Sequence, residues 1–235
     1  CMVEVEANGR KMTVASCTTP PMADAEVTTN SEAVQDLRRN VIELLMTEHP
    51  HGCLTCHRIE LCGPQDICQR HVTVTDRCTI CPKNERCELK DTVRLVELDL
   101  RTPLNYHRRD LPIHSDDPFY DRDYNLCIVC SRCVRVCDEV RFDTALTLTS
   151  RSGVALVGTA HGTSLLESGC EFCGACVDVC PTGSLTERNY KWEKAVKEVT
   201  TVCTNCPVGC QMIAEVNQFG KVVRFKADLA GSANN

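Results

Sequence analysis

One cysteine motif, C-x2-C-x2-C-x3-C, occurs twice in this chain of 235 residues. The first copy consists of Cys127, Cys130, Cys133 and Cys137, and the second of Cys170, Cys173, Cys176 and Cys180. Three thiolates at this spacing wrap a loop around one [4Fe-4S] cube, while the fourth, at the start of the next helix, ligates a second cube. We therefore expect two ligand sets: set A, formed by Cys127, Cys130, Cys133 and Cys180, and set B, formed by Cys170, Cys173, Cys176 and Cys137.

The cysteine content limits the kind of core that the chain can build. Twenty residues are cysteine, and the hydrophobic share of 43% includes all of them. Small modules ordered around inorganic clusters fit this composition better than one large apolar interior. We predict an α+β fold made of tandem iron-sulfur modules, with a ferredoxin-like two-cluster module over residues 127–190. Zinc is the alternative, although zinc sites more often use paired C-x2-C units.

Charge and hydropathy exclude other classes of protein. The formal net charge is -6 and the basic residues are scattered, so no nucleic-acid footprint is present. No apolar run approaches the roughly 18 residues of a membrane span. Thiolate ligands indicate a reducing compartment, the cytoplasm or the cytoplasmic face of a membrane complex. The chain begins at Cys1, and we expect it to be a piece of a longer protein, cut at both ends.

Residues 2–6 and 11–15 alternate as strands around Asn8-Gly9, which suits a tight hairpin turn. Cys1 and Cys17 stand at the two open ends, where both sulfurs could face one metal. This segment resembles the C-terminal half of the plant-type [2Fe-2S] domain at the front of the large iron-sulfur subunit of complex I. The resemblance implies that residues 1–28 supply two of four ligands to a [2Fe-2S] cluster. Two ordinary cysteines flanking a hairpin are the alternative.

A predicted amphipathic helix over residues 29–48, with Thr29 and Glu32 as a capping box, leads to a first tandem motif. This motif, H-x3-C-x2-C-x5-C, consists of His49, Cys53, Cys56 and Cys62. It is similar to the His/Cys3 [4Fe-4S] motif of complex I, of NAD-linked formate dehydrogenases and of multi-cluster [FeFe] hydrogenases. The spacing favours His49 as the ligand over His51 and His57. A neutral imidazole in place of a thiolate should raise the reduction potential of the cluster.

A second tandem motif, C-x2-C-x5-C, follows at Cys78, Cys81 and Cys87. Val74 occupies the place of the histidine, and Cys68 is the nearest spare sulfur. Two interpretations are open. Either residues 29–100 hold two cubes, with His49 closing the first and Cys68 the second, or one motif is a degenerate copy whose cysteines are buried thiols. We favour two cubes.

The rest of the chain contains a linker and one more motif. Residues 101–126 are rich in Pro, Asp and Arg and predict an extended surface linker. A short helix is expected over Lys191–Val199. Cys203, Cys206 and Cys210 follow, with strands at 211–216 and 221–225, and this segment, 198–235, resembles the N-terminal [4Fe-4S] segment of molybdopterin oxidoreductases. The alternative for these three cysteines is a zinc or incidental cluster.

The predicted function is electron transfer. A row of three to five [4Fe-4S] clusters and a partial [2Fe-2S] site suits single-electron movement between distant sites. The resemblance implies an oxidoreductase component with flavin- or NAD(H)-binding and other iron-sulfur subunits as partners, and with molybdopterin outside this segment. No catalytic residue is assigned here. We expect the arm of a formate-dehydrogenase-like enzyme; the alternatives are a complex I large subunit, a [FeFe] hydrogenase arm and, from another class, a zinc-stabilised scaffold.

Overall fold

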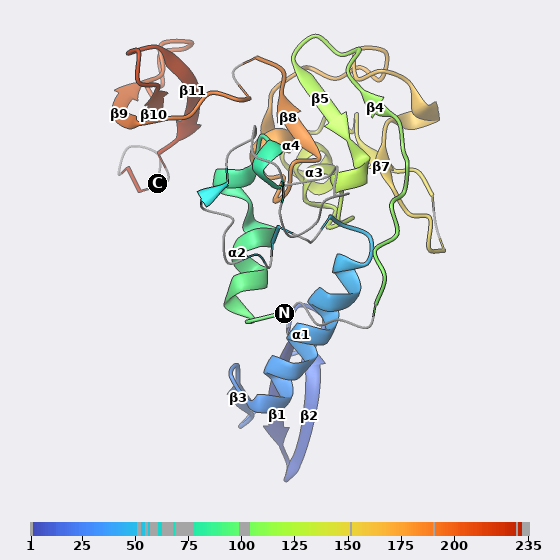
Figure 1. Ribbon diagram of the computed structural model, residues 1–235. Helices are drawn as coiled ribbons and strands as arrows, with labels where there is room; N and C mark the ends of the chain where they lie inside the picture. The colour runs from blue at the N-terminus through green and yellow to red at the C-terminus, as the bar shows by residue number, and fades with distance from the viewer. Residues whose placement is uncertain are drawn as a thin grey trace. The chain divides into compact units, whose positions relative to one another are not determined.

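A computed structural model describes residues 2–50, 53–54, 56, 61–62, 68, 78–98, 104–150, 152–189, 191–228 and 230–231 (Figure 1). The chain divides into two compact units. The first comprises Cys1–Asp117 and Asp121–Thr186, and the second Pro118–Tyr120 and Glu187–Asn235.

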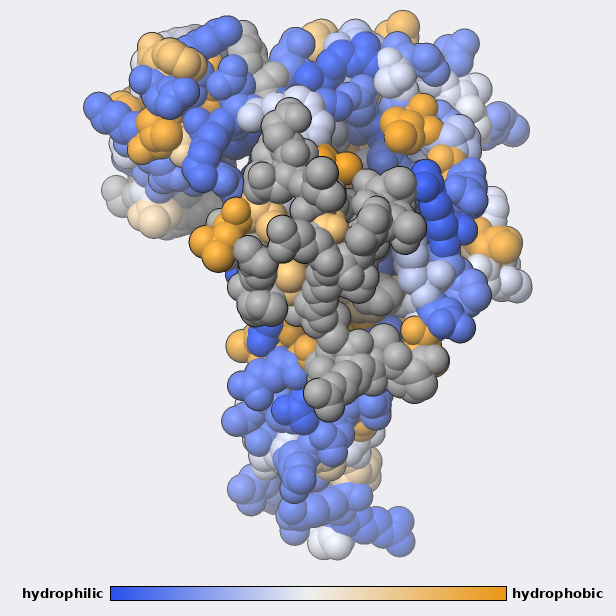
Figure 2. Space-filling model, in the orientation of Figure 1, coloured by the Kyte–Doolittle hydropathy of each residue, from blue (hydrophilic) through white to orange (hydrophobic). Residues whose placement is uncertain are grey.

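The first unit begins with the predicted hairpin. β1 (Met2–Ala7) and β2 (Arg10–Ala15) pair antiparallel, with Met2 opposite Ala15, and Asn8 and Gly9 turn the chain at positive φ. β3 (Glu26–Thr28) adds to the other edge of β1, which gives the sheet order β2-β1-β3. Figure 2 shows hydrophilic side chains over the turn end of this hairpin. The hairpin prediction is confirmed because alternation and turn chemistry are both local signals.

Helix α1 (Glu32–Met46) follows the sheet. Its N-cap is Ser31, whose hydroxyl accepts a hydrogen bond from the Val34 N–H at 3.3 Å. The predicted capping box at Thr29 and Glu32 is therefore wrong: Ser31 directly precedes the first helical residue, and its oxygen reaches the third N–H of the helix. The Arg39 Nε donates to the Val96 carbonyl at 2.9 Å and ties α1 to the end of the next helix.

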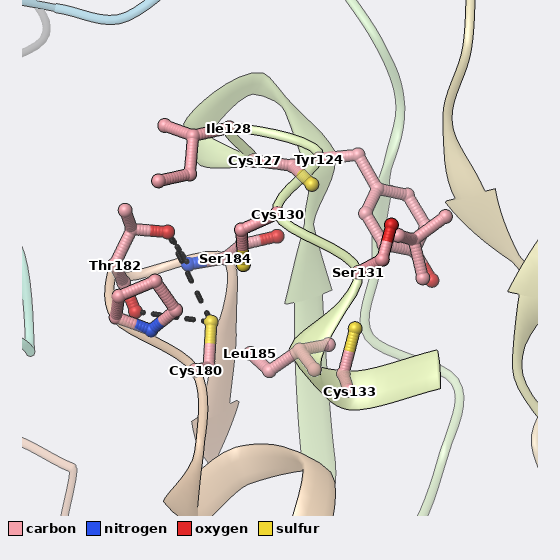
Figure 3. A pocket seen from close by; sticks show the side chains of 12 residues that line it. Tyr124, Cys127, Ile128, Cys130, Ser131, Cys133, Cys180, Thr182, Ser184 and Leu185 are labelled. Atoms are coloured by element: carbon pink, nitrogen blue, oxygen red, sulfur yellow. Dashed lines mark hydrogen bonds between the residues drawn. The ribbon is translucent and has the colours of Figure 1, made fainter. Parts of the chain in front are cut away.

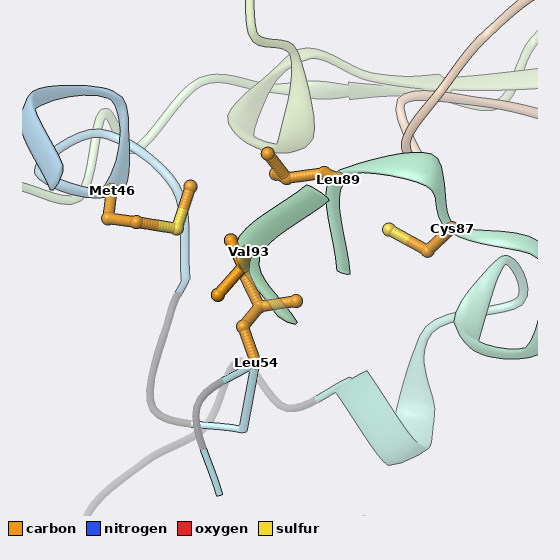
Figure 4. Packing of buried hydrophobic residues seen from close by; sticks show 5 residues of the cluster. All are labelled: Met46, Leu54, Cys87, Leu89 and Val93. Atoms are coloured by element: carbon orange, nitrogen blue, oxygen red, sulfur yellow. The ribbon is translucent and has the colours of Figure 1, made fainter. Parts of the chain in front are cut away.

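Helix α2 (Glu88–Leu95) packs against the end of α1 and supplies the main apolar cluster of this region. The cluster consists of Met46, Leu54, Cys87, Leu89 and Val93, whose side chains converge in Figure 4. Ile42, Leu45, Cys78, Leu98 and Ile128 pack against it. Cys78 and Cys87 of the second tandem motif thus share one apolar core with Met46 and Leu54, which lie just before and within the first tandem motif.

A three-stranded sheet, order β4-β5-β8, frames the two four-cysteine motifs. Its strands are β4 (Ile113–His114), β5 (Tyr120–Asp123) and β8 (Leu185–Glu187). The linker predicted over 101–126 is wrong in its second half, because residues 113–123 contribute two of these strands. The reason is a buried ion pair: Arg122 bonds Asp117 at 3.1 Å, and the other carboxylate oxygen of Asp117 accepts the Leu165 N–H at 2.7 Å.

Short helices hold the cysteines of these motifs. α3 (Arg132–Arg135) continues into a single π-helical turn, Val136–Val140, and α4 (Ala175–Asp178) occupies the matching place in the second copy. Between them, β6 (Thr147–Leu148) pairs antiparallel with β7 (Val157–Gly158). Single 3-10 turns lie at Cys78–Ile80, Asn84–Arg86, Tyr124–Leu126 and Ala160–Gly162.

The second unit contains a three-stranded antiparallel sheet, order β11-β10-β9. β10 (Gln211–Val216) and β11 (Val222–Ala227) are the predicted strands, and β9 (Lys197–Val202) takes up the end of the segment where a helix was expected. That helix prediction is wrong because β-branched residues fill β9 and pair with β10. Arg224 bonds the buried Glu215 carboxylate at 2.7 Å and joins β11 to β10.

Candidate iron-sulfur sites

The two four-cysteine motifs have the same backbone conformation. Val129 and Phe172, two residues after the first cysteine of each motif, have φ of 53° and 55°. Ser131 and Gly174, two residues further on, have φ of 61° and 81°. Left-handed backbone is costly for a β-branched valine. The repeated conformation turns successive N–H groups inward, as in the backbone nests that bind anions and iron-sulfur clusters.

In both motifs an inward N–H group donates to a cysteine sulfur. The Val129 N–H lies 3.4 Å from Cys127 Sγ, and the Phe172 N–H lies 3.3 Å from Cys170 Sγ. Such bonds stabilise negative charge on a thiolate, which is the form that ligates iron. The backbone is therefore arranged for a cysteine ligand that carries negative charge.

Set A lines one pocket that is open to solvent. Figure 3 shows the side chains of Cys127, Cys130, Cys133 and Cys180 around it, with Leu185 and Tyr124 in its wall. Burial raises the pKa of Cys133 to about 12, and the nearby Cys180, Cys127 and Cys130 add to the effect. A metal would displace these protons, because a coordinating thiol is deprotonated outright.

Hydrogen bonds fix the parts of this pocket that contain Cys180 and Tyr124. Thr182 Oγ1 donates to the Leu126 carbonyl at 2.8 Å, and Cys180 Sγ lies 3.4 Å from the Thr182 carbonyl (Figure 3). Arg122 Nη1 donates to the Tyr124 hydroxyl at 3.3 Å. Because Arg122 also forms the buried ion pair with Asp117, that pair positions the aromatic wall of the pocket.

Set B is gathered around Cys176. Burial raises the pKa of Cys176, and Cys133, Cys170, Cys173 and Cys137 act in the same direction. Cys133 belongs to set A, so the two sets are close enough for their thiols to interact. Cys137 and Cys180, the last cysteines of the two copies, have exchanged places between the sets. The structure thus brings the four cysteines of each predicted set together, and the binding of a cluster by each set stays a prediction.

The first tandem motif contains a buried histidine. His49 is 6% exposed, and its Nδ1 lies 3.0 Å from the Pro50 carbonyl. With Nδ1 as donor to that carbonyl, Nε2 carries the lone pair, the arrangement that metal-ligating histidines use. Cys53 and Cys56 are half-buried and Cys62 is exposed. His51 and His57 lie outside the described residues.

The second tandem motif is largely buried. Cys87 caps the N-terminus of α2, where its Sγ accepts the Lys90 N–H at 3.5 Å. Burial raises the pKa of Cys81 to about 11, while a hydrogen bond from the Lys83 N–H acts to lower it. The thiol in contact with Cys78 is that of Cys53, from the first tandem motif; this hydrogen bond and burial raise the pKa of Cys78. Cys68 is half-buried.

The second tandem motif packs directly on the turn that follows Cys180 and precedes β8. A Cβ atom at Gly183 would lie 2.5 Å from Cys81 Sγ, so the sulfur occupies the space that a side chain would need. Lys83, 3% exposed, donates from Nζ to the carbonyls of Val177 and Cys180, both at 3.1 Å. The Glu88 N–H donates to the Pro181 carbonyl at 3.1 Å.

Sequence reasoning did not identify Lys83, Gly183 or the Asp117–Arg122 pair. A lysine between two cysteines of one motif is the only local signal for Lys83. The roles of Gly183 and of the ion pair depend on contacts between segments far apart in the chain, which spacing does not encode.

The cysteines nearest the two ends of the chain lie beside antiparallel strand pairs. Cys17 is exposed after β2, and Cys1 lies outside the described residues. The Cys203 N–H donates to the Cys210 carbonyl at 2.8 Å, so these two residues face each other where β9 and β10 end. Cys206, in the loop between them, is exposed.

Within the described ranges, no three His, Cys, Asp or Glu side chains meet at a point that could hold a single metal ion. A [4Fe-4S] cluster requires a wider arrangement of ligands than a single ion does, because each thiolate binds a separate iron atom. The four thiols of set A, the inward N–H groups and the pocket are compatible with that arrangement. Among the residues that the structure describes, no helix is long and apolar enough to cross a membrane.

Three protein-family models match the chain. NADH-ubiquinone oxidoreductase-G iron-sulfur binding region matches residues 38–73. The ferredoxin-like domain of NADH-quinone oxidoreductase subunit 3 matches residues 117–186. The molybdopterin oxidoreductase Fe4S4 domain matches residues 196–235. The second match begins within the segment that was expected to be a linker, in agreement with the strands there.

Curated relatives match nearly the whole chain. NADPH-Fe(3+) oxidoreductase subunit alpha of Geobacter sulfurreducens is 31% identical over 97% of this chain and 24% of its own length. NADP-reducing hydrogenase subunit HndD of Solidesulfovibrio fructosivorans is 33% identical over 82% of this chain and 28% of its own. NADH-quinone oxidoreductase subunit 3 of Thermus thermophilus is 30% identical over 95% of this chain and 27% of its own length. The chain thus spans about a quarter of the length of these relatives.

A solved structure shares the fold. A chain in the crystal structure of NAD+-reducing [NiFe]-hydrogenase in the H2-reduced state superposes with a TM-score of 0.58 at 23% identity. The match covers 79% of this chain and 67% of that chain. The chain therefore carries, in tandem, iron-sulfur domains of the kinds that these family models describe, two of the NADH-quinone or NADH-ubiquinone oxidoreductase type and one of the molybdopterin oxidoreductase type.

Proposed function

We propose that this chain is the iron-sulfur electron-transfer arm of a multi-subunit, NAD(P)H-linked oxidoreductase. Set A and set B each take a [4Fe-4S] cluster, which supplies a one-electron carrier at each site. The observation that carries the proposal is that the two sets adjoin: helix α3, which contains Cys133 of set A, contacts helix α4, which contains Cys176 of set B. Neighbouring carriers of this kind pass electrons between partners that bind at separate surfaces.

The residues around set A and set B have distinct tasks in this role. Burial of Cys127, Cys133 and Cys180 excludes water from the inner side. Cys130 and Cys173 occupy equivalent positions in the two motifs and are both exposed. Each of the two sites therefore has one outward cysteine, through which an electron can enter or leave. The N–H groups of Val129 and Phe172 stabilise the added negative charge on the adjacent ligands.

The second tandem motif extends this row of sites. Cys81 lies against Gly183, three residues after Cys180 of set A, and Lys83 hydrogen-bonds the Cys180 carbonyl. An electron carrier held by the second tandem motif would therefore neighbour set A. We propose the order second tandem motif, set A, set B, with the direction of flow set by the potentials of the partners.

The proposed partners are a flavin- or NAD(H)-binding subunit and further iron-sulfur subunits. The relatives named above are subunits of NADPH-, NADP- and NADH-linked enzymes, which supports a pyridine nucleotide at one end. The Fe4S4 domain at residues 196–235 supports a molybdopterin-type domain at the other. We place substrate conversion in that domain, with formate as the first candidate substrate, and we place the complex in the cytoplasm or at the cytoplasmic face of a membrane.

A complex I-like role is the second candidate. The family matches at residues 38–73 and 117–186 favour it, since both descriptions name NADH-quinone or NADH-ubiquinone oxidoreductases. In that case the C-terminal domain passes electrons onward without a pterin substrate.

Anaerobic reduction of the purified complex tests these proposals. NADH, NADPH and formate are added separately, and bleaching of the iron-sulfur absorbance is followed together with EPR. We expect a pyridine nucleotide to reduce the clusters, and the EPR signals of sets A and B to show spin coupling because the sets adjoin. A colourless, zinc-containing protein would overturn the electron-transfer role. Reduction by formate supports the first candidate, and quinone-dependent reoxidation without formate activity supports the second.

A further inference from the structure

We propose that the hydroxyl group of Ser184 donates a hydrogen bond to the [4Fe-4S] cluster of set A and raises the reduction potential of that cluster. Ser184 is not one of the expected ligands, which are the four cysteines of the set. The inference deepens the electron-transfer role proposed above and rests on it, because it concerns the cluster that set A takes in that role.

Ser184 lies in the turn between Cys180 and β8, and its side chain faces set A. It lines the same pocket as the four cysteines of the set. Figure 3 shows the Ser184 side chain among these cysteines, beside Thr182. Leu185, the first residue of β8, lines the pocket as well. This segment therefore presents one polar and one apolar side chain to the cluster site.

Backbone hydrogen bonds fix the position of Ser184. Its carbonyl accepts the Asp123 N–H at 2.8 Å, which joins this segment to β5. Its N–H donates to Thr182 Oγ1 at 3.4 Å, and that hydroxyl donates to the Leu126 carbonyl at 2.8 Å. Leu126 directly precedes Cys127 in the chain. Ser184 is thus held by segments next to the first and the last ligand of set A.

The Ser184 hydroxyl differs from the other hydroxyl groups that line this pocket. Three of them have protein partners: Thr182 Oγ1 with the Leu126 carbonyl, the Tyr124 hydroxyl with Arg122 Nη1, and Ser131 Oγ with the Val129 carbonyl. Among the residues that the structure describes, none forms a hydrogen bond with Ser184 Oγ. Ser184 is only 3% exposed and its oxygen is buried, so bulk water does not take the place of a partner.

A buried hydroxyl without a partner destabilises a protein, and nearly all such groups are hydrogen-bonded in folded proteins. A [4Fe-4S] cluster held by set A supplies acceptors beside Ser184, namely its sulfides and the cysteine thiolates. The hydrogen bond is stronger to the reduced cluster, because that form carries one more negative charge. It therefore stabilises the reduced form and raises the reduction potential.

An EPR-monitored redox titration of the purified complex with dithionite tests the direction of the effect. The signal of set A is the one that changes in Cys130→Ser, a variant of the outward ligand. In Ser184→Ala we expect that signal and the iron content to be retained, with the midpoint potential moved to a more negative value. Ser184→Thr keeps the hydroxyl and is expected to return the potential toward that of the unmodified protein.

Ser168→Ala is the matched control for this titration. Ser168 Oγ donates to the Leu165 carbonyl at 2.7 Å, and Ser168 does not line the pocket, so we expect no shift. A potential in Ser184→Ala that is unchanged or more positive would overturn the inference. Loss of the set A irons while the signal of set B persists would show that Ser184 is a ligand and would also overturn it.

A crystal structure of the iron-loaded complex measures the contact directly and does not depend on the folding of any variant. We expect Ser184 Oγ within about 3.5 Å of a sulfide or a thiolate of set A. A Ser184 hydroxyl that is bonded to a backbone carbonyl or to an ordered water would refute the inference. Neither experiment uses NAD(P)H, so failure of the proposed function is detected separately, whereas zinc in set A would overturn both.

Discussion

Replacement of Lys83 by methionine should lower the reduction potential of set A. Lys83 is 3% exposed, and its Nζ donates to the carbonyls of Val177 and Cys180 at 3.1 Å. Because Cys180 belongs to set A, the ammonium charge lies within the first layer of atoms around that site. Methionine has a similar length but removes the charge and both hydrogen bonds.

The magnitude follows from Coulomb's law for a separation of about 8 Å, the order expected between a cluster and a cation that hydrogen-bonds the carbonyl of a ligand residue. Two unit charges about 8 Å apart interact by about 2 kcal/mol at an effective dielectric constant of about 20. For a one-electron couple this energy corresponds to about 90 mV. Loss of the positive charge makes it less favourable to add an electron to the cluster, so the reduction potential of set A shifts to a more negative value.

An EPR-monitored redox titration of the intact complex measures this shift. Lys83→Arg keeps the charge and should move the potential far less. Lys11→Met is the matched control, since Lys11 is an exposed lysine of the N-terminal hairpin. If Lys83→Met shifts the potential of set A no more than Lys11→Met does, the buried charge does not tune the site and the reasoning is wrong.

Three further perturbations have defined outcomes. Gly183→Ala places a Cβ 2.5 Å from Cys81 Sγ, so we expect a loss of about 1–3 kcal/mol in unfolding free energy and a changed EPR line shape at the second tandem motif. Asp117→Asn leaves Arg122 buried without its carboxylate partner, and we expect a loss of about 3–5 kcal/mol in denaturant unfolding. Burial raises the pKa of Cys133 from 9.0 to about 12. Iron-depleted protein should therefore keep this stabilisation below pH 9.0 and lose it as the pH rises through about 12, whereas iron-loaded protein, whose thiols are already deprotonated, should not show this loss in thermal unfolding.

The controls for these perturbations come from the same chain. Gly153→Ala introduces a Cβ that meets nothing, and it should leave the EPR line shape unchanged. Asp110→Asn disrupts an exposed pair with Arg108 and should change stability by less than about 1 kcal/mol. Equal effects of Asp117→Asn and Asp110→Asn would contradict the role of the buried pair. A pH profile that is the same for iron-loaded and iron-depleted protein would contradict the role of the buried thiols.

The spacing of cysteines along the chain is enough, by itself, to indicate the chemistry of this protein. Cysteines two or three residues apart can reach one cluster only through a tight loop, so the motif predicts both the loop and the exchange of Cys137 with Cys180. The hairpin at Asn8-Gly9 and the strand β10 were equally predictable, because alternation and turn residues are local signals. The family match at residues 196–235 agrees with the segment predicted at 198–235.

The long-range contacts were decided only by the tertiary structure. Cys53 meets Cys78, and Lys83 reaches Cys180, because α2 and the segments that carry these residues pack into shared cores; no sequence spacing records that packing. Residues 113–123 resemble a linker because they are polar, yet the Asp117–Arg122 ion pair satisfies its own charges and allows the segment to be buried. A helix was expected over residues 191–199, but pairing with β10 satisfies the backbone hydrogen bonds of Lys197–Val202 as a strand. Local spacing determines which atoms can share a loop, whereas burial and hydrogen-bond pairing between distant segments determine which loops share a site.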